Sequence, residues 1–230
     1  MSCSPLLQFK HAILCTNTSE WRTMAMDDGH NRILAMEVLE KLEQRNIGGT
    51  YVESKEAALA AVLDMVPRES LSSYGGSQTL REIGLRQAMK ARGYNFLDPD
   101  DGETGAAKDE IAHRALGADY YLTSVNAIAL TGELVNAEGY GNRVGAFIFG
   151  PKRVIVVAGV NKIVPTVDAA VARAKTYAAQ RTVMLFKQDY GTFDELAQVA
   201  DNACSHLVVT SRSATKGRVS VVLVGERLGF

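Results

Sequence analysis

The sequence predicts an α/β protein of three layers, in which a mostly parallel sheet is flanked by helices. Two segments, 120–122 and 154–158, consist of apolar residues that are largely β-branched or aromatic, and no polar residue interrupts either segment. Such runs are typical of strands that are covered on both faces of a parallel sheet. In the part of the chain before residue 120, helix-like segments alternate with short strand-like segments. This β-α alternation also favours a parallel sheet.

The composition indicates a single globular domain. The 230 residues contain no linker-like stretch and no block of like charge, so we expect one α/β domain over residues 28–230. Residues 1–27 show no clear pattern, and we interpret them as an N-terminal arm or an extra strand. The net charge is −1 without a basic stripe, which argues against a nucleic-acid partner. No apolar run approaches the roughly 20 residues that cross a bilayer, and no signal pattern is visible, so we expect a cytoplasmic protein without a membrane partner.

The first half of the chain contains helices and strands in turn. Ser54 is a suitable N-cap and Pro67 a suitable terminator for one of the helices. In order, we expect a helix at 30–45, a strand at 50–52, a helix between Ser54 and Pro67, and a strand at 71–74.

A glycine turn follows the strand at 71–74. Thr79 and Glu82 have the spacing of a capping box, so a helix should begin directly behind Gly75, Gly76 and Ser77. Glycines let a ligand approach the backbone, and free N–H groups at a helix start attract anions. The turn is therefore a candidate cradle for a phosphate or carboxylate, the alternative being an ordinary tight turn.

The later elements follow the same reasoning. The acidic segment 98–103 lacks apolar anchors, so we expect a solvated connection, and its spacing departs from a calcium loop. The last two strands flank the basic segment 212–218 and could form a hairpin. In order, we expect a strand at 94–97, helices at 107–116 and 165–180, a strand at 183–186, a helix at 193–200, and strands at 207–209 and 219–224.

Polar residues gather between and just after the two central strands. Asn161 and Lys162 directly follow the strand at 154–158, and in open α/β sheets ligands bind beyond the carboxyl ends of strands. Lys162 would offer a point charge to an anion. The candidate ligand-binding residues between the strands are Asn126, Asn136, Gly139, Gly141, Asn142 and Arg143. Asparagine beside glycine is also common in turns, and Asn142 could cap a short helix at 144–149.

Two carboxylates are candidate catalytic groups. Glu138 lies in the glycine-rich loop close to Arg143. Arg143 could bind a substrate carboxylate or phosphate and leave Glu138 free as a general base or nucleophile, or it could pair with Glu138 and hold the loop. Asp119 follows Gly117-Ala118, a short motif similar to one that carries an active-site aspartate in sugar-phosphate isomerases. Asp119 could equally cap a helix or the sheet edge.

Several motifs together resemble the lactate-utilisation family known as the LUD domain. Its pattern G-x-L-x-N-x-[DE]-G-x-G-N-R is matched from Gly132 to Arg143, and its G-P-K-[KR] and N-K-I-V motifs by 150–153 and 161–164. The similarity extends to residues 74–77, 82–84, 222–226 and 228–230. The resemblance implies the fold shared by glucosamine-phosphate isomerase, ribose-5-phosphate isomerase and CoA transferases.

The resemblance also implies a function in organic-acid metabolism. We expect the chain to bind a small anionic metabolite, such as an organic acid, a sugar phosphate or an acyl-CoA, with isomerase-like or acyl/CoA-transfer-like chemistry as an open question. The alternative is a non-catalytic subunit of an organic-acid oxidoreductase complex. Oxidoreductase subunits and further copies of the chain are accordingly the expected protein partners.

The cysteines and histidines do not indicate a metal site. Relatives often carry a cysteine cluster suggestive of iron–sulfur binding, of which only Cys204 remains here, and a lone thiol cannot hold a cluster. We therefore expect no iron–sulfur cluster, leave any other cofactor open, and interpret Cys204 as a small buried residue. The four histidines are scattered, which argues against a catalytic triad or a zinc site.

Overall fold

The computed structural model describes residues 28–186 and 192–230. The arm or strand expected at 1–27 lies outside these residues. All statements below refer to the described residues.

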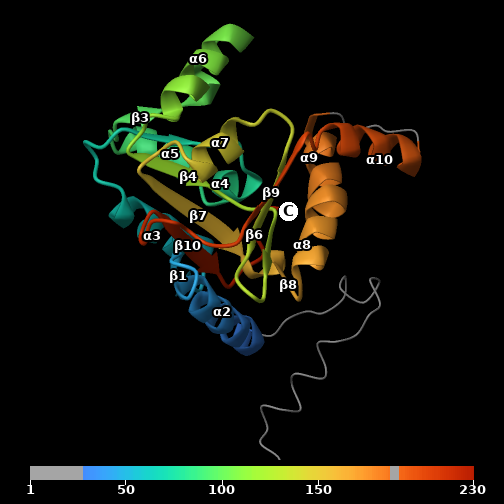
Figure 1. Ribbon diagram of the computed structural model, residues 1–230. Helices are drawn as coiled ribbons and strands as arrows, with labels where there is room; N and C mark the ends of the chain where they lie inside the picture. Colours follow the sequence, from blue (N-terminus) through green and yellow to red (C-terminus); the bar gives the residue numbers. More distant parts are fainter. Residues whose placement is uncertain (1–27, 187–191) are drawn as a thin grey trace, which may run out of the picture.

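Six parallel strands form the main sheet, in the order β1-β10-β7-β4-β2-β3 (Figure 1). The two segments that predicted this sheet, β4 and β7, are direct neighbours, with Tyr121 opposite Val154. β10 lies between β7 and β1, with Val222 opposite both Val157 and Thr50. The strands are β1 (Gly48–Val52), β2 (Ser72–Tyr74), β3 (Phe96–Leu97), β4 (Tyr120–Thr123), β7 (Arg153–Gly159) and β10 (Val219–Val224).

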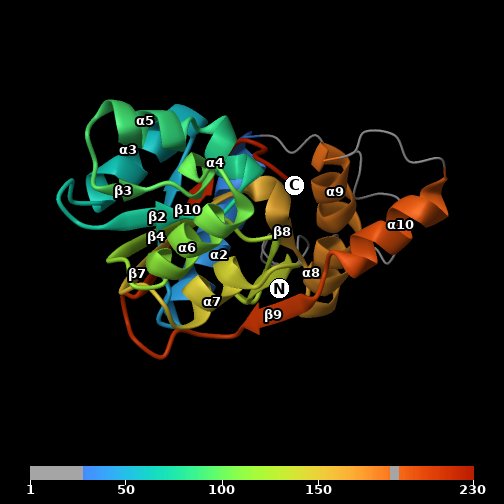
Figure 2. The ribbon, with the colours of Figure 1, turned by 90° about the horizontal axis from the view of Figure 1, so that it is seen from above.

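Helices cover both faces of the main sheet, as the apolar strands require. Along β7, Ile155 and Val157 pack into one buried cluster with α3 (Lys55–Met65), α4 (Gln78–Glu82) and α5 (Leu85–Ala91). Val154 and Val156 face the other cluster, which α2 (Asp28–Glu43), α6 (Gly105–Ala115) and α7 (Asn142–Ile148) contribute to. Figure 2 shows these two helical layers on opposite sides of the strands. The predicted three-layer α/β fold is confirmed.

A second, smaller sheet lies beside the main one and was not predicted. It consists of β8 (Ile163–Val164), β5 (Ala127–Ala129), β6 (Leu134–Glu138) and β9 (His206–Thr210), in that order. Only the β5–β8 pair is parallel. Its outer face packs on small residues of α8 (Val167–Arg173) and the π-helical η4 (Ala174–Ala178), and α9 (Ala179–Phe186) and α10 (Phe193–Asn202) continue beyond them (Figure 2).

Two predicted elements near the end of the chain are wrong. Residues 183–186 belong to helix α9, where Val183 packs against Ala179 and Ala200. A short apolar run does not distinguish a strand from a buried helix turn, which explains the error. β9 and β10 do not form a hairpin, since β9 pairs with β6 in the small sheet and β10 enters the main sheet.

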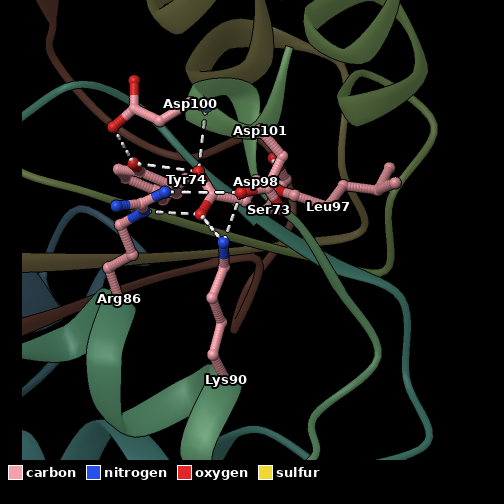
Figure 3. Close-up of polar contacts among 8 residues, drawn as sticks. All are labelled: Ser73, Tyr74, Arg86, Lys90, Leu97, Asp98, Asp100 and Asp101. Carbon is pink, nitrogen blue, oxygen red and sulfur yellow. Dashed lines mark hydrogen bonds and ion pairs between the residues drawn. The ribbon is translucent and has the colours of Figure 1, made fainter. Parts of the chain in front are cut away.

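The acidic segment after β3 is not merely a solvated connection. Asp98 is only 2 % exposed and accepts hydrogen bonds from Arg86 and Tyr74. The ammonium of Lys90 lies 2.6 Å from its carboxylate (Figure 3). Burial by itself would raise the pKa of Asp98, but the hydrogen bonds from Lys90 and Arg86 outweigh it and hold that pKa below its ordinary value. The segment, with the 3₁₀ turn η2 (Pro99–Asp101), thus ties the edge of the sheet to α5.

Within residues 28–186 and 192–230, none of the helices combines the length and the apolar character needed to span a membrane.

Candidate functional site

The carboxyl edge of the main sheet brings together segments that are distant in the chain. Gly75 follows β2, Ser124 follows β4, and Lys162 lies in the 3₁₀ turn η3 (Val160–Lys162) after β7. Residues 225–230 follow β10 and pass over the same edge, where the amide of Leu228 donates to the side chain of Asn161. The parallel topology therefore brings the glycine turn and the Asn161-Lys162 pair to the same edge of the sheet, where ligands bind in open α/β folds.

Lys162 is buried within this edge rather than exposed at it. Its side chain is only 2 % exposed. Its ammonium donates to three neutral oxygens: Oγ1 of Thr79 at 3.0 Å, Oγ of Ser124 at 2.9 Å and the carbonyl of Val125 at 3.0 Å. Among the described residues it forms no ion pair with a carboxylate, which is an unusual environment for a lysine.

The surroundings of Lys162 disfavour its charged form. Burial holds the pKa of Lys162 well below its ordinary value. The positive charges of Arg173 and Arg143 act in the same direction, and Glu82 opposes them.

Arg143 joins the two sheets. It extends from the first turn of α7, and its guanidinium donates to the carbonyl of Ser124 at 3.3 Å and to that of Ala137 at 3.0 Å. It also donates to the side-chain oxygens of Asn136 and Asn126. Ser124 belongs to the main sheet edge and the other three to the small sheet, so Arg143 fixes one relative to the other.

Glu138 pairs loosely with Arg143. Its Oε2 accepts the backbone N–H of Val144 at 2.9 Å, which holds the start of α7, and its Oε1 lies 3.7 Å from Nε of Arg143. The side chain of Glu138 is 15 % exposed. Burial and the negative charge of Glu138 raise the pKa of nearby Tyr121. Glu138 thus pairs with Arg143 and holds the loop, which is the structural one of the two roles weighed from the sequence.

The asparagines have different surroundings. Asn126 accepts the N–H of Ala137 and binds the small sheet to its own loop. Asn161 holds the backbone of residues 228–229 through its amide. Asn136 is fully buried, and its Nδ2 has no hydrogen-bond partner within the described part of the chain. An unpartnered buried donor is costly, and here it lies beside Arg143.

Arg173 is a member of the site that the sequence reasoning missed. It extends from the end of α8 and donates to the backbone carbonyls of Asn126 and Asn161. Burial lowers the pKa of Arg173 to about 10, so the guanidinium is charged at neutral pH. The helical spacing from the buried Ala170, three residues earlier, places Arg173 on the inner face of the helix and would have indicated it.

The glycine turn packs closely against the site. A Cβ on Gly75 would lie 2.9 Å from Cγ and Cδ of Arg143, so a glycine is needed there, whereas Gly76 has open space around it. Ser77 is the N-cap of α4, with its Oγ accepting the N–H of Leu80. The expected capping box of Thr79 and Glu82 is therefore wrong, and Thr79 instead contacts Lys162.

Three further candidates, Gly139, Gly141 and Asn142, support the loop before α7. They do not line the cation cluster, by which we mean Arg143, Lys162 and Arg173. Gly139 packs against the backbone of Ala203, and Gly141 is the N-cap of α7. Asn142 is the first residue of that helix, not its cap, because the chain enters the helix one residue earlier than expected.

Asp119 lies at the opposite edge of the sheet. It precedes β4, and its carboxylate accepts the N–H of Leu71 at 3.1 Å and pairs with Lys152 at 2.7 Å. The hydrogen bond from Lys152 lowers the pKa of Asp119. The structure does not bring Asp119 together with Glu138, because they lie at opposite ends of the strands.

Cys204 is partly exposed rather than buried. It packs beside the alanines of α8 and η4, and its burial, followed by the charge of Asp201, raises the pKa of its thiol. Across the described ranges, no three His, Cys, Asp or Glu side chains gather as metal ligands would.

The site combines more positive than negative charge. Arg143 and Lys162 are buried and Arg173 is partly exposed, and only Glu138 among the described carboxylates lies within 4 Å of any of them. Buried charges are usually paired, so this excess is a feature that an anion would neutralise.

Two hollows open elsewhere in the described structure. One, of about 150 Å³, lies at the amino edge of the sheet beside Arg153 and Arg218, and another, of about 360 Å³, lies beside Lys41 and Arg212. The guanidinium of Arg218 is already bound to backbone carbonyls of α7 and its following turn. The charged residues that line both hollows are cations, but all of them are exposed or partly exposed. The carboxyl edge, where Arg143 and Lys162 are buried, is therefore the stronger candidate.

Known proteins support the assignment of the fold and the family. No curated protein matches the chain. Among solved structures, the chain is similar to a DUF162 family protein from Deinococcus radiodurans, with a TM-score of 0.51 and 15 % identity over 84 % of this chain and 98 % of that one. The family model of the LUD domain matches residues 35–224. This span includes both sheets and the cations Arg143, Lys162 and Arg173, and it ends at the last residue of β10. The chain therefore belongs to the LUD domain family.

Proposed function

We infer that the chain binds a small anionic metabolite at the carboxyl edge of its main sheet. The observation that carries this proposal is the buried cluster of Arg143, Lys162 and Arg173, which has a single carboxylate beside it. Membership of a lactate-utilisation family agrees with an organic acid as the ligand. Sugar phosphates and acyl-CoA thioesters are also anionic and are the other candidate classes.

Arg143 is the principal anion-binding residue in this proposal. Its planar guanidinium can hold a carboxylate or phosphate by two parallel hydrogen bonds. Its present contact with Glu138 is long, at 3.7 Å, so a ligand carboxylate could take the position nearest Nε without breaking a tight ion pair. The unpartnered Nδ2 of Asn136 supplies a further donor next to it.

In an enzymatic form of the proposal, Glu138 is the acid–base or nucleophilic group. Its Oε2 is held by the N–H of Val144, while Oε1 is free to accept a proton or attack a thioester. This arrangement suits a proton transfer next to a carbonyl, or an acyl transfer.

The experiment is a thermal-shift titration with lactate, 2-oxo acids, sugar phosphates and CoA thioesters. A ligand that binds only the folded protein raises its free energy of unfolding by about 2.7 kcal/mol at a concentration of 100 times Kd, and so raises Tm. We expect one class to give a saturable rise, and Arg143→Ala to abolish it.

Arg153→Ala is the matched control, because Arg153 is an exposed arginine at the opposite edge of the same sheet. It should leave the rise unchanged. A rise that survives Arg143→Ala, or that Arg153→Ala removes equally, would place the anion elsewhere.

The second candidate is an accessory subunit of an organic-acid oxidoreductase complex. It is favoured by β9, which pairs only with β6 and exposes Leu207 and Val209 by 44 % and 39 %. Exposed apolar side chains on an edge strand are typical of surfaces that pair with another chain. Absence of any shift across the ligand classes would favour this reading.

A further inference from the structure

The ε-amine of Lys162 has surroundings that suit a nucleophile better than a charged anchor. It is buried, its three oxygen neighbours are neutral, and the positive charges of Arg173 and Arg143 act on it more strongly than the negative charge of Glu82. A lysine is made nucleophilic at neutral pH by desolvation and by neighbouring cations, because both favour the neutral amine.

Two hydroxyls beside the amine can move protons. The hydroxyl of Ser124 can donate to Thr79 Oγ1 at 3.3 Å or to the carbonyl of Val125 at 3.4 Å, and that of Thr79 can donate to the carbonyl of Leu228 at 3.4 Å. Either hydroxyl can instead turn its proton toward the nitrogen. The network therefore accommodates both the ammonium and the amine, as a proton relay requires.

The amine and the anion-binding arginine are separated by a single residue. The carbonyl of Ser124 lies 3.3 Å from Nη1 of Arg143, and the Oγ of the same Ser124 lies 2.9 Å from Nζ of Lys162. A ligand whose carboxylate contacts Arg143 and whose reactive carbon contacts Lys162 must therefore be short, with the two groups adjacent or nearly so.

We propose that Lys162 attacks the carbonyl carbon of a small 2-oxo acid whose carboxylate is bound by Arg143, and forms an imine with it. The inference rests on the anion site proposed above and specifies its substrate class. The nitrogen lone pair forms the C–N bond while the C=O π pair moves to oxygen, which takes up the first proton that nitrogen releases through Ser124 or Thr79. The second N–H proton reaches the resulting hydroxyl by the same route, the C–O bond breaks with its electron pair leaving on water, and the nitrogen lone pair forms the C=N bond. Amine and ketone thus become imine and water without a redox change.

The segment after β10 covers the amine and must move for the substrate to enter. Gly229 has a left-handed φ of 57°, and a Cβ on it would lie 2.5 Å from Thr79 Oγ1 and 3.4 Å from Nζ of Lys162. The cover is held by hydrogen bonds, since the N–H of Gly229 donates to Glu82 at 2.7 Å and that of Leu228 to Asn161 at 3.0 Å. Such contacts exchange with water at low cost when the segment lifts.

The test is borohydride trapping followed by peptide mass mapping. The protein is incubated with glyoxylate, pyruvate or 2-oxoglutarate, and the imine is reduced to a stable secondary amine. We expect a mass increase equal to that of the acid less one oxygen, located on Lys162 at least about tenfold above Lys152, whose side chain is 79 % exposed. Adducts spread over surface lysines, or none, would overturn the proposal.

Lys162→Met and lactate complete the design. The variant should lose the adduct, and lactate, which has no carbonyl carbon to attack, should bind without giving one. If a 2-oxo acid raises Tm in an Arg143-dependent manner but leaves no adduct on Lys162, the imine is excluded while the anion site stands. If neither effect is seen, both proposals fail.

Discussion

The contact between Gly75 and Arg143 shows how one absent side chain sets the position of a guanidinium. The turn after β2 passes so close to the arginine that a Cβ would lie 2.9 Å from its Cγ and Cδ, and also 2.9 Å from the hydroxyl of Tyr121. These atoms belong to a packed stem and a buried ring, so they cannot move aside freely.

Substitution Gly75→Ala should therefore weaken anion binding. We expect a loss of about tenfold, which corresponds to about 1.4 kcal/mol, because the guanidinium would be displaced from its carbonyl partners. Isothermal titration with the ligand class found above measures it. Gly76→Ala is the matched control, since nothing lies within 4 Å of that position, and equal affinity of the two variants would contradict the argument.

The sequence suggested which residues to consider for the candidate site, but it did not indicate how deeply they are buried. Arg143, Glu138 and Lys162 became candidates because glycines surround the first two and a buried strand precedes the third. The burial of Lys162 depends on residues 228–229, which are far away in the chain and reach it only through the sheet topology. No local pattern contains that information.

At the scale of elements, α5 stabilises the edge of the main sheet through charge. Arg86 and Lys90 are four residues apart on α5, so both face Asp98, which follows the short strand β3. Tyr74 at the end of β2 completes the network (Figure 3), and burial, together with its hydrogen bond to Asp100, raises the pKa of that phenol. A strand as short as β3 needs such support, because its backbone pairing with β2 is limited to two residues.

Asp98→Asn should destabilise the fold by about 2–3 kcal/mol, since it weakens hydrogen bonds to charged groups at a buried position. Asp101→Asn is the matched control. Asp101 contacts the same two cations but its side chain is 55 % exposed, so its loss should cost about 0.2–1 kcal/mol. Urea unfolding of the two variants measures the difference, and similar losses would show that burial is not decisive.

The pH dependence of this network has a defined sign. Because the pKa of Asp98 is lower in the folded protein than its ordinary value of 3.8, its contribution is present above that pH. It is lost as the pH falls through the folded-state pKa, where the unfolded chain already binds the proton.

Short elements were the least predictable part of the fold. The main sheet could be predicted because β4, β7 and β10 are largely apolar, as buried parallel strands are. The small sheet could not, because β5 and β8 span three and two residues and their pairing is set by distant neighbours. Residues 183–186 were mistaken for a strand for the same reason of length.

For the whole molecule, the cation cluster opposes folding. Burial lowers the pKa of Lys162 in the folded protein, whereas the same lysine is charged and hydrated in the unfolded chain. The unfolded state therefore binds more protons than the folded state. The free energy of unfolding should then rise with pH between the depressed folded-state pKa of Lys162 and its ordinary value of 10.5.

Lys162→Met should raise Tm and remove this rise with pH. The expected gain is a few degrees, because about 1 kcal/mol shifts Tm of a chain of this size by roughly 2–4 °C. Calorimetry from pH 7 to pH 10 measures both effects. A lower Tm with an unchanged pH slope would show that the three hydrogen bonds of Lys162 outweigh its burial. A stabilised variant that no longer forms the adduct would indicate that stability is lost in favour of function.

The place of β10 in the main sheet has a consequence for biosynthesis. It follows every other strand in the chain, yet it is the neighbour of both β7 and β1. While a ribosome is still producing residues 219–224, β1 lacks the one strand that it pairs with among the described strands of the main sheet. The earliest segments must therefore wait for the latest ones, and a nascent chain of this topology depends on remaining unaggregated until its last strand leaves the exit tunnel.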